Sequence, residues 1–273
     1  MASFLISFGL LLFPPASATQ GAEAETQPEP REIEVVHLAN EGFLLRAGED
    51  AVLIDAFVAE PYSIYAALSP EAADALATAA APFDKVKVAL ASHVHRDHFQ
   101  PEIAGAFLDS APSAVFASSP DALELLRQEL GSSKGMRAVL PEEGQRVTLD
   151  VEGVQVEFLR LSHGTGRFQS IQNLGHVIRI GGQKILHVGD AQVAPQVFAP
   201  YELVKERIDV ALVPYWYFDS PEGRRIVKEQ FNARHVVAVH VPPRELRAVT
   251  TRLSEEGIHV FQRCLEAKLY APR

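Results

Sequence analysis

Residues 92–101 read SHVHRDHFQP and place His93, His95, Asp97 and His98 within six positions. The apolar run before them, KVKVALA (85–91), predicts a buried strand. Imidazole nitrogen and carboxylate oxygen are ligands that hold zinc and similar divalent metals. Residues two apart in extended chain point the same way, so His93 and His95 can bind one ion. Asp97 and His98 turn away as the chain leaves the strand and could bind a second ion nearby. The alternative is a polar loop that is merely rich in histidine, and the downstream sequence favours the metal site.

Three later segments carry further ligand types where predicted strands end. His163 follows the strand-like run VEFLRL, Asp190 follows KILHV, and His240 follows VVAV. Strand ends are where α/β folds gather their functional residues, because loops there are held on a rigid scaffold. His187 lies three residues before Asp190, so strand alternation places it on the opposite face, as a buried or supporting residue.

The pattern of the whole chain predicts one α/β domain. Strand-like runs fill residues 33–57, and later strands alternate with helices expected at 69–83, 119–131, 220–232 and 242–257. A Ser-Pro pair opens each of the first three helices, which is a typical start signal. The nearly all-apolar run IDVALVP (208–214) is typical of a strand buried on both faces. Two packed sheets with helices outside are therefore expected.

Taken together, these motifs resemble the metallo-β-lactamase superfamily of metal-dependent hydrolases. The segment 93–98 matches the superfamily's His-x-His-x-Asp-His core, and His163, Gly189-Asp190 and His240 match its later ligands in order. The resemblance covers about residues 32–265 and implies an αββα sandwich of two packed mixed β-sheets with helices on the outer faces. The stretches HLANEGFLLRAGEDAVLIDAF (37–57) and ILHVGDA (185–191) are most similar to the branch that includes ascorbate-6-phosphate lactonase and the phospholipase D acting on N-acyl phosphatidylethanolamine.

The resemblance implies a binuclear metal site. His93, His95 and His163 are expected to hold one ion, Asp97, His98 and His240 the second, and Asp190 to bridge them. Asp55 matches an aspartate that commonly supports such a site. The two divalent ions are expected to be Zn²⁺, with Mn²⁺ or Fe²⁺ as alternatives. Asp97 and His240 are assigned to catalysis as well, Asp97 through proton movement.

The composition of the chain limits which binding partners and covalent links are expected. The chain has 273 residues and a formal charge of −10, which argues against broad binding of nucleic acid. The lone Cys264 cannot form an internal disulfide and is expected to be a buried structural residue.

Residues 1–18 predict a cleaved signal peptide and 19–31 a flexible linker, followed by a metallo-β-lactamase-like domain at 32–273. The mature protein is then secreted or periplasmic, without a transmembrane span. A buried or disordered N-terminal extension, or a start codon assigned at the wrong place, is the alternative.

Five residues are candidates for a substrate pocket. Tyr215, Trp216 and Tyr217 follow the buried strand and could line a pocket or close the core. Arg167 could bind a substrate anion, and His37 could approach the cleft, although most such residues are only solvated or structural. His176, His235 and His259 are expected to be structural or surface residues.

The expected function is metal-dependent hydrolysis of a lactone, ester or phosphodiester by a metal-bridging hydroxide, acting on a small-molecule or lipid-like substrate. Three alternatives remain: an oxidoreductase with one iron on the same fold, a β-lactamase, and a non-catalytic metal-binding scaffold. Within the superfamily, class B β-lactamases lack the bridging carboxylate and some use a cysteine ligand, so the resemblance argues against a β-lactamase here.

Overall fold

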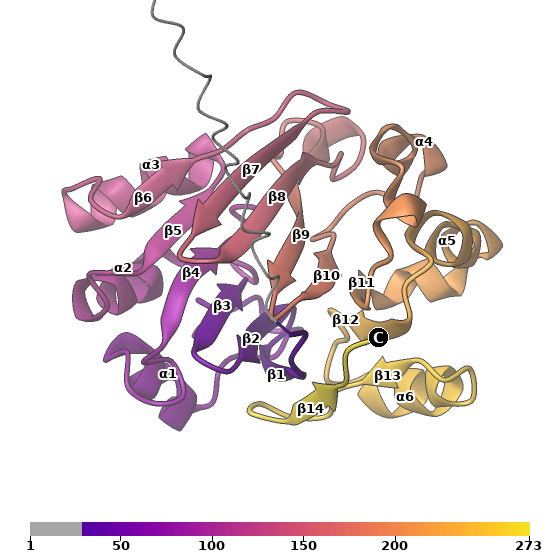
Figure 1. The fold of residues 1–273 in the computed structure, drawn as a ribbon, viewed down its shortest axis with the longest axis horizontal. Coiled ribbons are helices and arrows are strands. Elements are labelled where there is room, and N and C mark those ends of the chain that lie inside the picture. The colour runs from indigo at the N-terminus through magenta and orange to yellow at the C-terminus, as the bar shows by residue number, and fades with distance from the viewer. Residues whose placement is uncertain (1–28) are drawn as a thin grey trace, which may run out of the picture.

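A computed structural model describes residues 29–273 and shows two seven-stranded sheets packed face to face (Figure 1). The expected signal peptide (1–18) and most of the expected linker (19–31) lie outside the described residues. Arg31, at the end of that linker, donates its backbone N–H to the Gly181 carbonyl and pairs its guanidinium with Asp50. The chain is therefore anchored to both sheets just before the first strand begins.

The first sheet has the order β14-β1-β2-β3-β4-β5-β6, and the second has the order β13-β12-β11-β10-β9-β8-β7. The strands of the first sheet are β1 (Ile33–Ala39), β2 (Gly42–Ala47), β3 (Asp50–Ile54), β4 (Val86–Leu90), β5 (Val115–Ser118), β6 (Met136–Ala138) and β14 (Ala267–Tyr270). Those of the second are β7 (Arg146–Val151), β8 (Val154–Arg160), β9 (Leu174–Ile180), β10 (Gln183–His187), β11 (Val210–Pro214), β12 (His235–Val239) and β13 (His259–Val260). Both sheets contain parallel and antiparallel pairs, so both are mixed.

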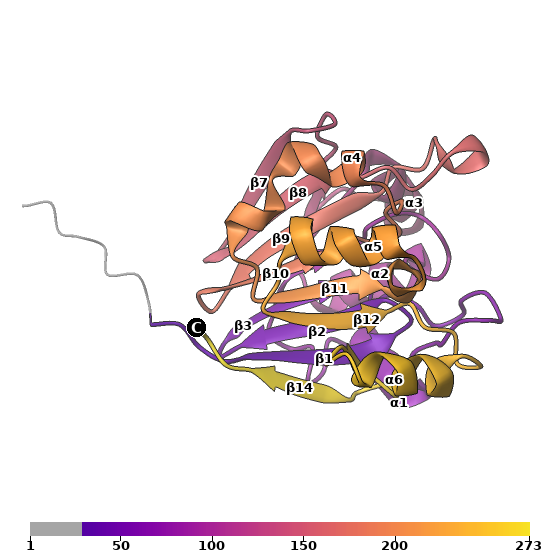
Figure 2. The same cartoon turned by 90° about the vertical axis from the view of Figure 1, so that its right-hand side faces the viewer.

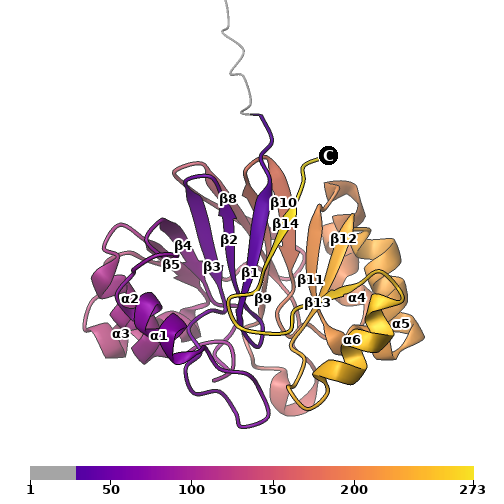
Figure 3. The same ribbon diagram turned by 90° about the horizontal axis from the view of Figure 1, so that it is seen from below.

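Helices cover the outer face of each sheet, so the molecule has four layers (Figure 3). The helices beside the first sheet are α1 (Pro70–Ala77), α2 (Pro101–Ser110) and α3 (Pro120–Leu130). Those beside the second are α4 (Pro195–Phe198), α5 (Pro221–Arg225), which continues as a π-helical turn (Ile226–Phe231), and α6 (Leu246–Ser254). This arrangement confirms the expected αββα sandwich.

Three apolar clusters hold the layers together, one between the sheets and one beneath each helical layer. Val88 and Ile178 belong to the central cluster, Phe107 and Leu126 to the layer under α2 and α3, and Phe231 to the layer under α5. The strand β11 lies between β10 and β12 in parallel register and is buried at all five positions. Its all-apolar sequence follows from burial on both faces.

Most expected elements are present, and a few differ from the expectation. Ser119 caps α3 through its side chain, and Gly131 ends the helix in a left-handed conformation at φ 63°, as the sequence indicates. The helix expected at 69–83 ends at Ala77. The edge strand β14 pairs antiparallel with β1 (Figure 2) and escaped sequence analysis, because three of its four residues are exposed and its pattern is not apolar. Within residues 29–273, no helix is long and apolar enough to cross a membrane.

Candidate metal centre

Strand ends from both sheets deliver the candidate ligands to one edge of the sandwich. The loop 91–100 follows β4, while His163, Asp190 and His240 follow β8, β10 and β12. Asp55 and His240 directly follow their strands and adopt left-handed backbone conformations, at φ 45° and 62°. Such conformations are costly for residues with a Cβ and cluster at functional sites.

A glycine is required before Asp190 for a steric reason. Gly189 has φ 53°, and a Cβ there would lie 2.5 Å from the Asn173 side-chain oxygen and 2.8 Å from the Ser92 Cβ. The same Asn173 oxygen accepts a hydrogen bond from the Asp190 backbone N–H at 3.2 Å. The Gly-Asp pair therefore combines a tight turn with a fixed position for the carboxylate that follows it.

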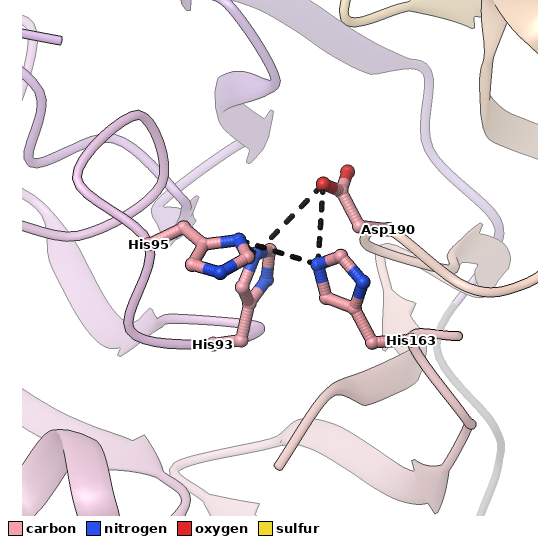
Figure 4. Close-up of side chains that lie close together, drawn as sticks. All are labelled: His93, His95, His163 and Asp190. Atoms are coloured by element: carbon pink, nitrogen blue, oxygen red, sulfur yellow. Dashed lines mark hydrogen bonds and ion pairs between the residues drawn. The ribbon is translucent and has the colours of Figure 1, made fainter. Parts of the chain in front are cut away.

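The first group of ligand atoms comes from His93, His95, His163 and Asp190 (Figure 4). His95 Nδ1 lies 2.9 Å from His93 Nε2 and 3.2 Å from His163 Nε2. Asp190 Oδ2 lies 3.5 Å from His163 Nε2 and 3.9 Å from His93 Nε2. Four ligands at about 2.1 Å around a tetrahedral ion stand about 3.4 Å from one another, so these spacings suit one metal ion.

The second group forms around His98 and His240, whose Nε2 atoms lie 3.0 Å apart. Asp97 Oδ2 lies 3.2 Å from His240 Nε2 and 3.6 Å from His98 Nε2. Asp190 Oδ1 lies 3.4 Å and 3.5 Å from the same two nitrogens. Each oxygen of Asp190 therefore faces a different cluster of nitrogens.

The donor set fits two divalent metals on chemical grounds. Asp190 Oδ1 is buried and has no hydrogen-bond partner among the described residues. A buried carboxylate oxygen without a partner is costly unless a cation or a donor satisfies it. Three imidazoles on one side and two imidazoles with Asp97 on the other are the ligand types that borderline divalent ions prefer.

Asp55 supports the second group from behind. Its carboxylate accepts hydrogen bonds from His98 Nδ1 at 2.8 Å, from the Ser92 backbone N–H at 2.6 Å and from the Ser92 hydroxyl at 2.5 Å. The bond to Nδ1 fixes the ring so that Nε2 faces His240 and the two carboxylates. This carboxylate–histidine arrangement orients a ligand and raises its basicity.

Protonation differs between the two groups. Burial lowers the pKa of His93 well below its ordinary value, and the charge of His98 lowers it further, so the ring is neutral with a free lone pair. Burial also opposes a charge on His98, but Asp190 and Asp55 outweigh it and raise the pKa of His98 well above the ordinary value. Burial would raise the pKa of Asp190, but His240 and His98 hold it well below its usual range. An ion bound at the second group would therefore displace a proton from His98.

Glu41, in the turn between β1 and β2, is a residue that sequence analysis missed. It is fully buried, neither oxygen has a hydrogen-bond partner among residues 29–273, and it lies within ligand range of His98, Asp190 and His240. Its closest approach to His98 is 3.6 Å, to Nδ1, which already donates to Asp55. Asp97 stands on the Nε2 side, and burial raises the pKa of Glu41 well above its usual range. We therefore assign Asp97, and not Glu41, to the second group.

His187 lies behind the site, on the face that strand alternation indicates. It is fully buried, and its Nε2 lies 3.6 Å from Glu41 Oε1 and 3.8 Å from Asp55 Oδ2. Glu41, Asp55 and His187 thus form an interior polar group beneath the two clusters. His176 is also fully buried, with its ring 5.8 Å from that of His187.

A cleft of about 600 Å³ opens onto the candidate ligands. Asp97, Asp190, His95 and His163 line its floor, and Arg167 is on its wall. The cleft is otherwise lined by aromatic and apolar residues that the sequence did not single out: Tyr62, Ile64, Tyr65, Phe168 and Ile171. Tyr62 and Ile64 are 51% and 45% exposed, so part of the apolar lining of the cleft is open to solvent.

The three consecutive aromatics lie beside this cleft and do not line it. Tyr217 is fully buried in the core, and its hydroxyl donates to the Ala191 carbonyl at 2.7 Å. Tyr215 is half-buried and donates to Glu245, while the Trp216 ring lies edge-on to His240 with centroids 5.0 Å apart. Tyr217 therefore fits the alternative interpretation, in which the run closes the core, while Trp216 packs against His240.

His37 and Cys264 lie elsewhere. His37 stacks on Phe261, its Nδ1 lies 3.1 Å from the Arg263 carbonyl, and it lines a separate cavity behind His240. Cys264 lines the same cavity and is half-buried, not buried as expected. Both residues come together because the chain after β13 returns along β1, a contact that local sequence does not reveal.

Comparison with known proteins places the chain in a family. The family model described as a β-lactamase superfamily domain matches residues 50–258. Igni18, a metallo hydrolase from Ignicoccus hospitalis, has 17% sequence identity and a TM-score of 0.62, over 89% of this chain and 100% of its own. A possible metal-dependent hydrolase from Veillonella parvula has 18% identity and a TM-score of 0.60, over 86% and 98%.

A di-iron β-hydroxylase from Streptomyces venezuelae, CmlA, is also similar in fold. Its identity is 14% and its TM-score 0.55, over 91% of this chain and 55% of its own. At such identities the likeness to solved structures shows the fold alone. No sequence among the curated proteins matches this chain.

Proposed function

Since the chain belongs to the metallo-β-lactamase superfamily and carries its hydrolase fold, we propose that it hydrolyses an organic lactone, ester or phosphodiester at a binuclear metal centre. The observation that carries the proposal is the position of Asp190, whose Oδ2 faces His93 and His163 while Oδ1 faces His98 and His240. A carboxylate in this position can hold two cations together and screen their repulsion.

We propose that His93, His95 and His163 hold one ion, and Asp97, His98 and His240 the other, with Zn²⁺ as the most suitable metal for this donor set. Metals bound there would activate water near neutral pH and polarise the substrate oxygen. The protein's own part is to lower the pKa values of His93 and His95 by burial and to fix ligand rings such as that of His98. Asp97, which accepts a hydrogen bond from Asn40 at 3.1 Å, also faces the cleft and is positioned to move a proton.

The lining of the cleft supports a partly apolar substrate with a polar or anionic group. Tyr62, Ile64 and Phe168 provide apolar contact area, whereas Arg167 is the cationic residue on the wall, with its guanidinium 4.7 Å from the Phe168 ring centre. This combination favours an amphiphilic or lipid-like ester over free inorganic phosphate. It agrees with the lactonase- and phosphodiesterase-like branch.

A substrate panel tests the proposal. Model lactones, aryl esters and bis-aryl phosphodiesters are to be assayed with zinc, manganese and iron in turn, beside a set of β-lactams. We expect metal-dependent turnover of at least one ester-like class and weak or absent turnover of β-lactams. Efficient β-lactam hydrolysis with inert esters, lactones and phosphodiesters would contradict the proposal.

A second candidate is an iron-dependent oxidoreductase. The His and Asp ligands suit Fe(II), and the fold is shared with the di-iron β-hydroxylase CmlA. Oxygen consumption by iron-loaded protein, with no hydrolysis under zinc or manganese, would favour this candidate.

A further inference from the structure

A second cavity lies behind His240, separate from the cleft. Its volume is about 120 Å³, and it is enclosed by β1, β12 and the segment around α6 and β13. Its walls are largely apolar, formed by Leu38, Phe43, Val239, Leu246, Val260 and Phe261. The cavity and the cleft share no lining residue. Tyr65 lines the cleft, and the next residues along the chain, Ala66 and Ala67, line the cavity.

One end of this cavity is polar and incompletely paired. Asn40 and His240 both line it and are only 3% and 2% exposed. Asn40 Oδ1 and His240 Nδ1 are buried and have no hydrogen-bond partner among the described residues. Other polar groups of the wall are already engaged, since His37 Nδ1 lies 3.1 Å from the Arg263 carbonyl and Gln262 Nε2 donates to Thr250. Buried polar atoms of this kind require a partner.

The partners of Asn40 Nδ2 and His240 Nε2 determine whether the unpaired atoms, Asn40 Oδ1 and His240 Nδ1, act as acceptor or donor. Asn40 Nδ2 donates to the Asp97 carbonyl and carboxylate, each at 3.1 Å, and a carboxylate only accepts, so Oδ1 is the free acceptor. His240 Nε2 is a proposed ligand of the second metal, and when its lone pair is on that metal, Nδ1 carries the ring proton and can donate it. The cavity therefore presents one acceptor and one donor.

We propose that this cavity is a binding site for a small uncharged alcohol. A hydroxyl group is both donor and acceptor, so one oxygen can donate to Asn40 Oδ1 and accept from His240 Nδ1. The apolar walls bury the carbon chain. A dry apolar cavity of about 150 Å³ holds benzene, so the volume here suits a chain of about four carbons. A carboxylate of the same length is disfavoured, because it would face the Asn40 oxygen without a proton to share.

The site is coupled to the candidate metal centre through Asp97. Asn40 and His240 both contact the Asp97 carboxylate, at 3.1 and 3.2 Å. A bound alcohol would hold both side chains in one orientation on the side of the proposed second metal. The inference rests on the metal centre of the proposed function, because the Nδ1 proton follows from a metal at Nε2, but it does not depend on the reaction catalysed there.

Ligand-observed NMR with 1-butanol tests this inference on the zinc-reconstituted full chain. We expect 1-butanol to bind, and sodium butyrate to bind about tenfold more weakly or not at all. Ala66→Leu, which fills the cavity, should weaken butanol binding at least about tenfold. The matched control Ala111→Leu, at a half-buried position that lines neither the cavity nor the cleft, should leave binding unchanged.

Chemical shifts of the protein's methyl groups test the inference on the wild-type chain, without the variants. With butanol, the methyl signals of Leu246 and Val260 should move, while those of Ile64 and Ile171 in the cleft stay in place. Absence of butanol binding, equal binding of butyrate, or shifts confined to the cleft would each overturn the inference. If the protein hydrolyses esters but does not bind butanol, the inference is wrong and the proposed function is unaffected. If it binds butanol but hydrolyses none of the substrates, the proposed function is wrong and the inference is unaffected.

Discussion

Two polar clusters of this molecule differ in whether their polar and charged groups are paired within the chain. On the second sheet, Arg146, Arg179 and Lys184 are paired with Glu157 and Glu206, at N···O distances between 2.5 and 3.2 Å. At the candidate metal centre, imidazole nitrogens face one another at 2.9 to 3.2 Å, and a buried carboxylate oxygen has no donor among the described residues. The first cluster is complete within the chain. The second has the form of a site that is completed by a cation, and this difference separates a structural network from a functional one.

Removing a side chain that is a proposed metal ligand should have the largest effect on activity. His93→Ala should lower activity by more than about 100-fold, because loss of a group that merely supports a ligand already costs 10–100-fold. The fold should survive, since the apolar clusters are untouched. Activity, metal content and circular dichroism are the measurements. His235→Ala, at the opposite end of β12 from His240, is the matched control and should leave all three unchanged.

Weakening the support of a ligand should have an intermediate effect. Asp55→Asn exchanges a carboxylate that accepts three hydrogen bonds, including the one from His98 Nδ1, for an amide. We expect metal affinity to fall by about 10–100-fold while the bound stoichiometry at saturating metal is retained. Competition with a chelator of known affinity measures the change. Unchanged affinity would show that His98 does not need this anchor.

A substitution in the ion-pair cluster on the second sheet should lower the stability of the protein and leave metal binding unchanged. Glu206→Gln removes a carboxylate whose pKa is shifted downward, because its bonds to Lys184 and Arg146 outweigh burial. A lowered folded-state pKa means that this stability is present above the unfolded value and is lost as the pH falls. We expect a loss of about 1–3 kcal/mol at neutral pH, between the values for exposed and fully buried pairs. Denaturant unfolding measures it, with Glu202→Gln in an exposed pair as the control.

His176, a buried histidine whose ring nitrogens have no hydrogen-bond partner among residues 29–273, gives the smallest effect at neutral pH. Burial lowers the pKa of His176 to about 3, so protonation favours the unfolded state as the pH falls below about 6.5. His176→Leu should therefore reduce the loss of stability between pH 7 and pH 5 by about 2 kcal/mol. Unfolding curves of both proteins at the two pH values provide the comparison. Parallel pH dependence would show that His176 is hydrated in the folded state.

The sequence was most informative where chemistry and strand ends coincide. His93, His95, Asp97, His98, His163, Asp190 and His240 could be selected because metal ligands are few in kind and each follows a strand pattern. All seven lie together in the structure.

Other parts of the site depend on contacts that no local pattern records. Glu41 lies in a turn between two apolar strands, and only the packing of both sheets buries it beneath His98. Tyr62 and Ile64 have no periodicity and reach the cleft through the path of the loop after β3. Tyr217 follows a strand like a pocket residue, yet the turn after β11 directs it into the core.

The central claim is that Asp190 joins two metal ions, and metal content measures it most directly. Wild-type protein and Asp190→Ala are to be reconstituted with zinc, freed of excess metal and analysed for zinc per chain. We predict two ions in the wild-type protein and fewer in the variant, because each Asp190 oxygen serves a different cluster. One ion per chain in both proteins, with the fold intact, would contradict the account.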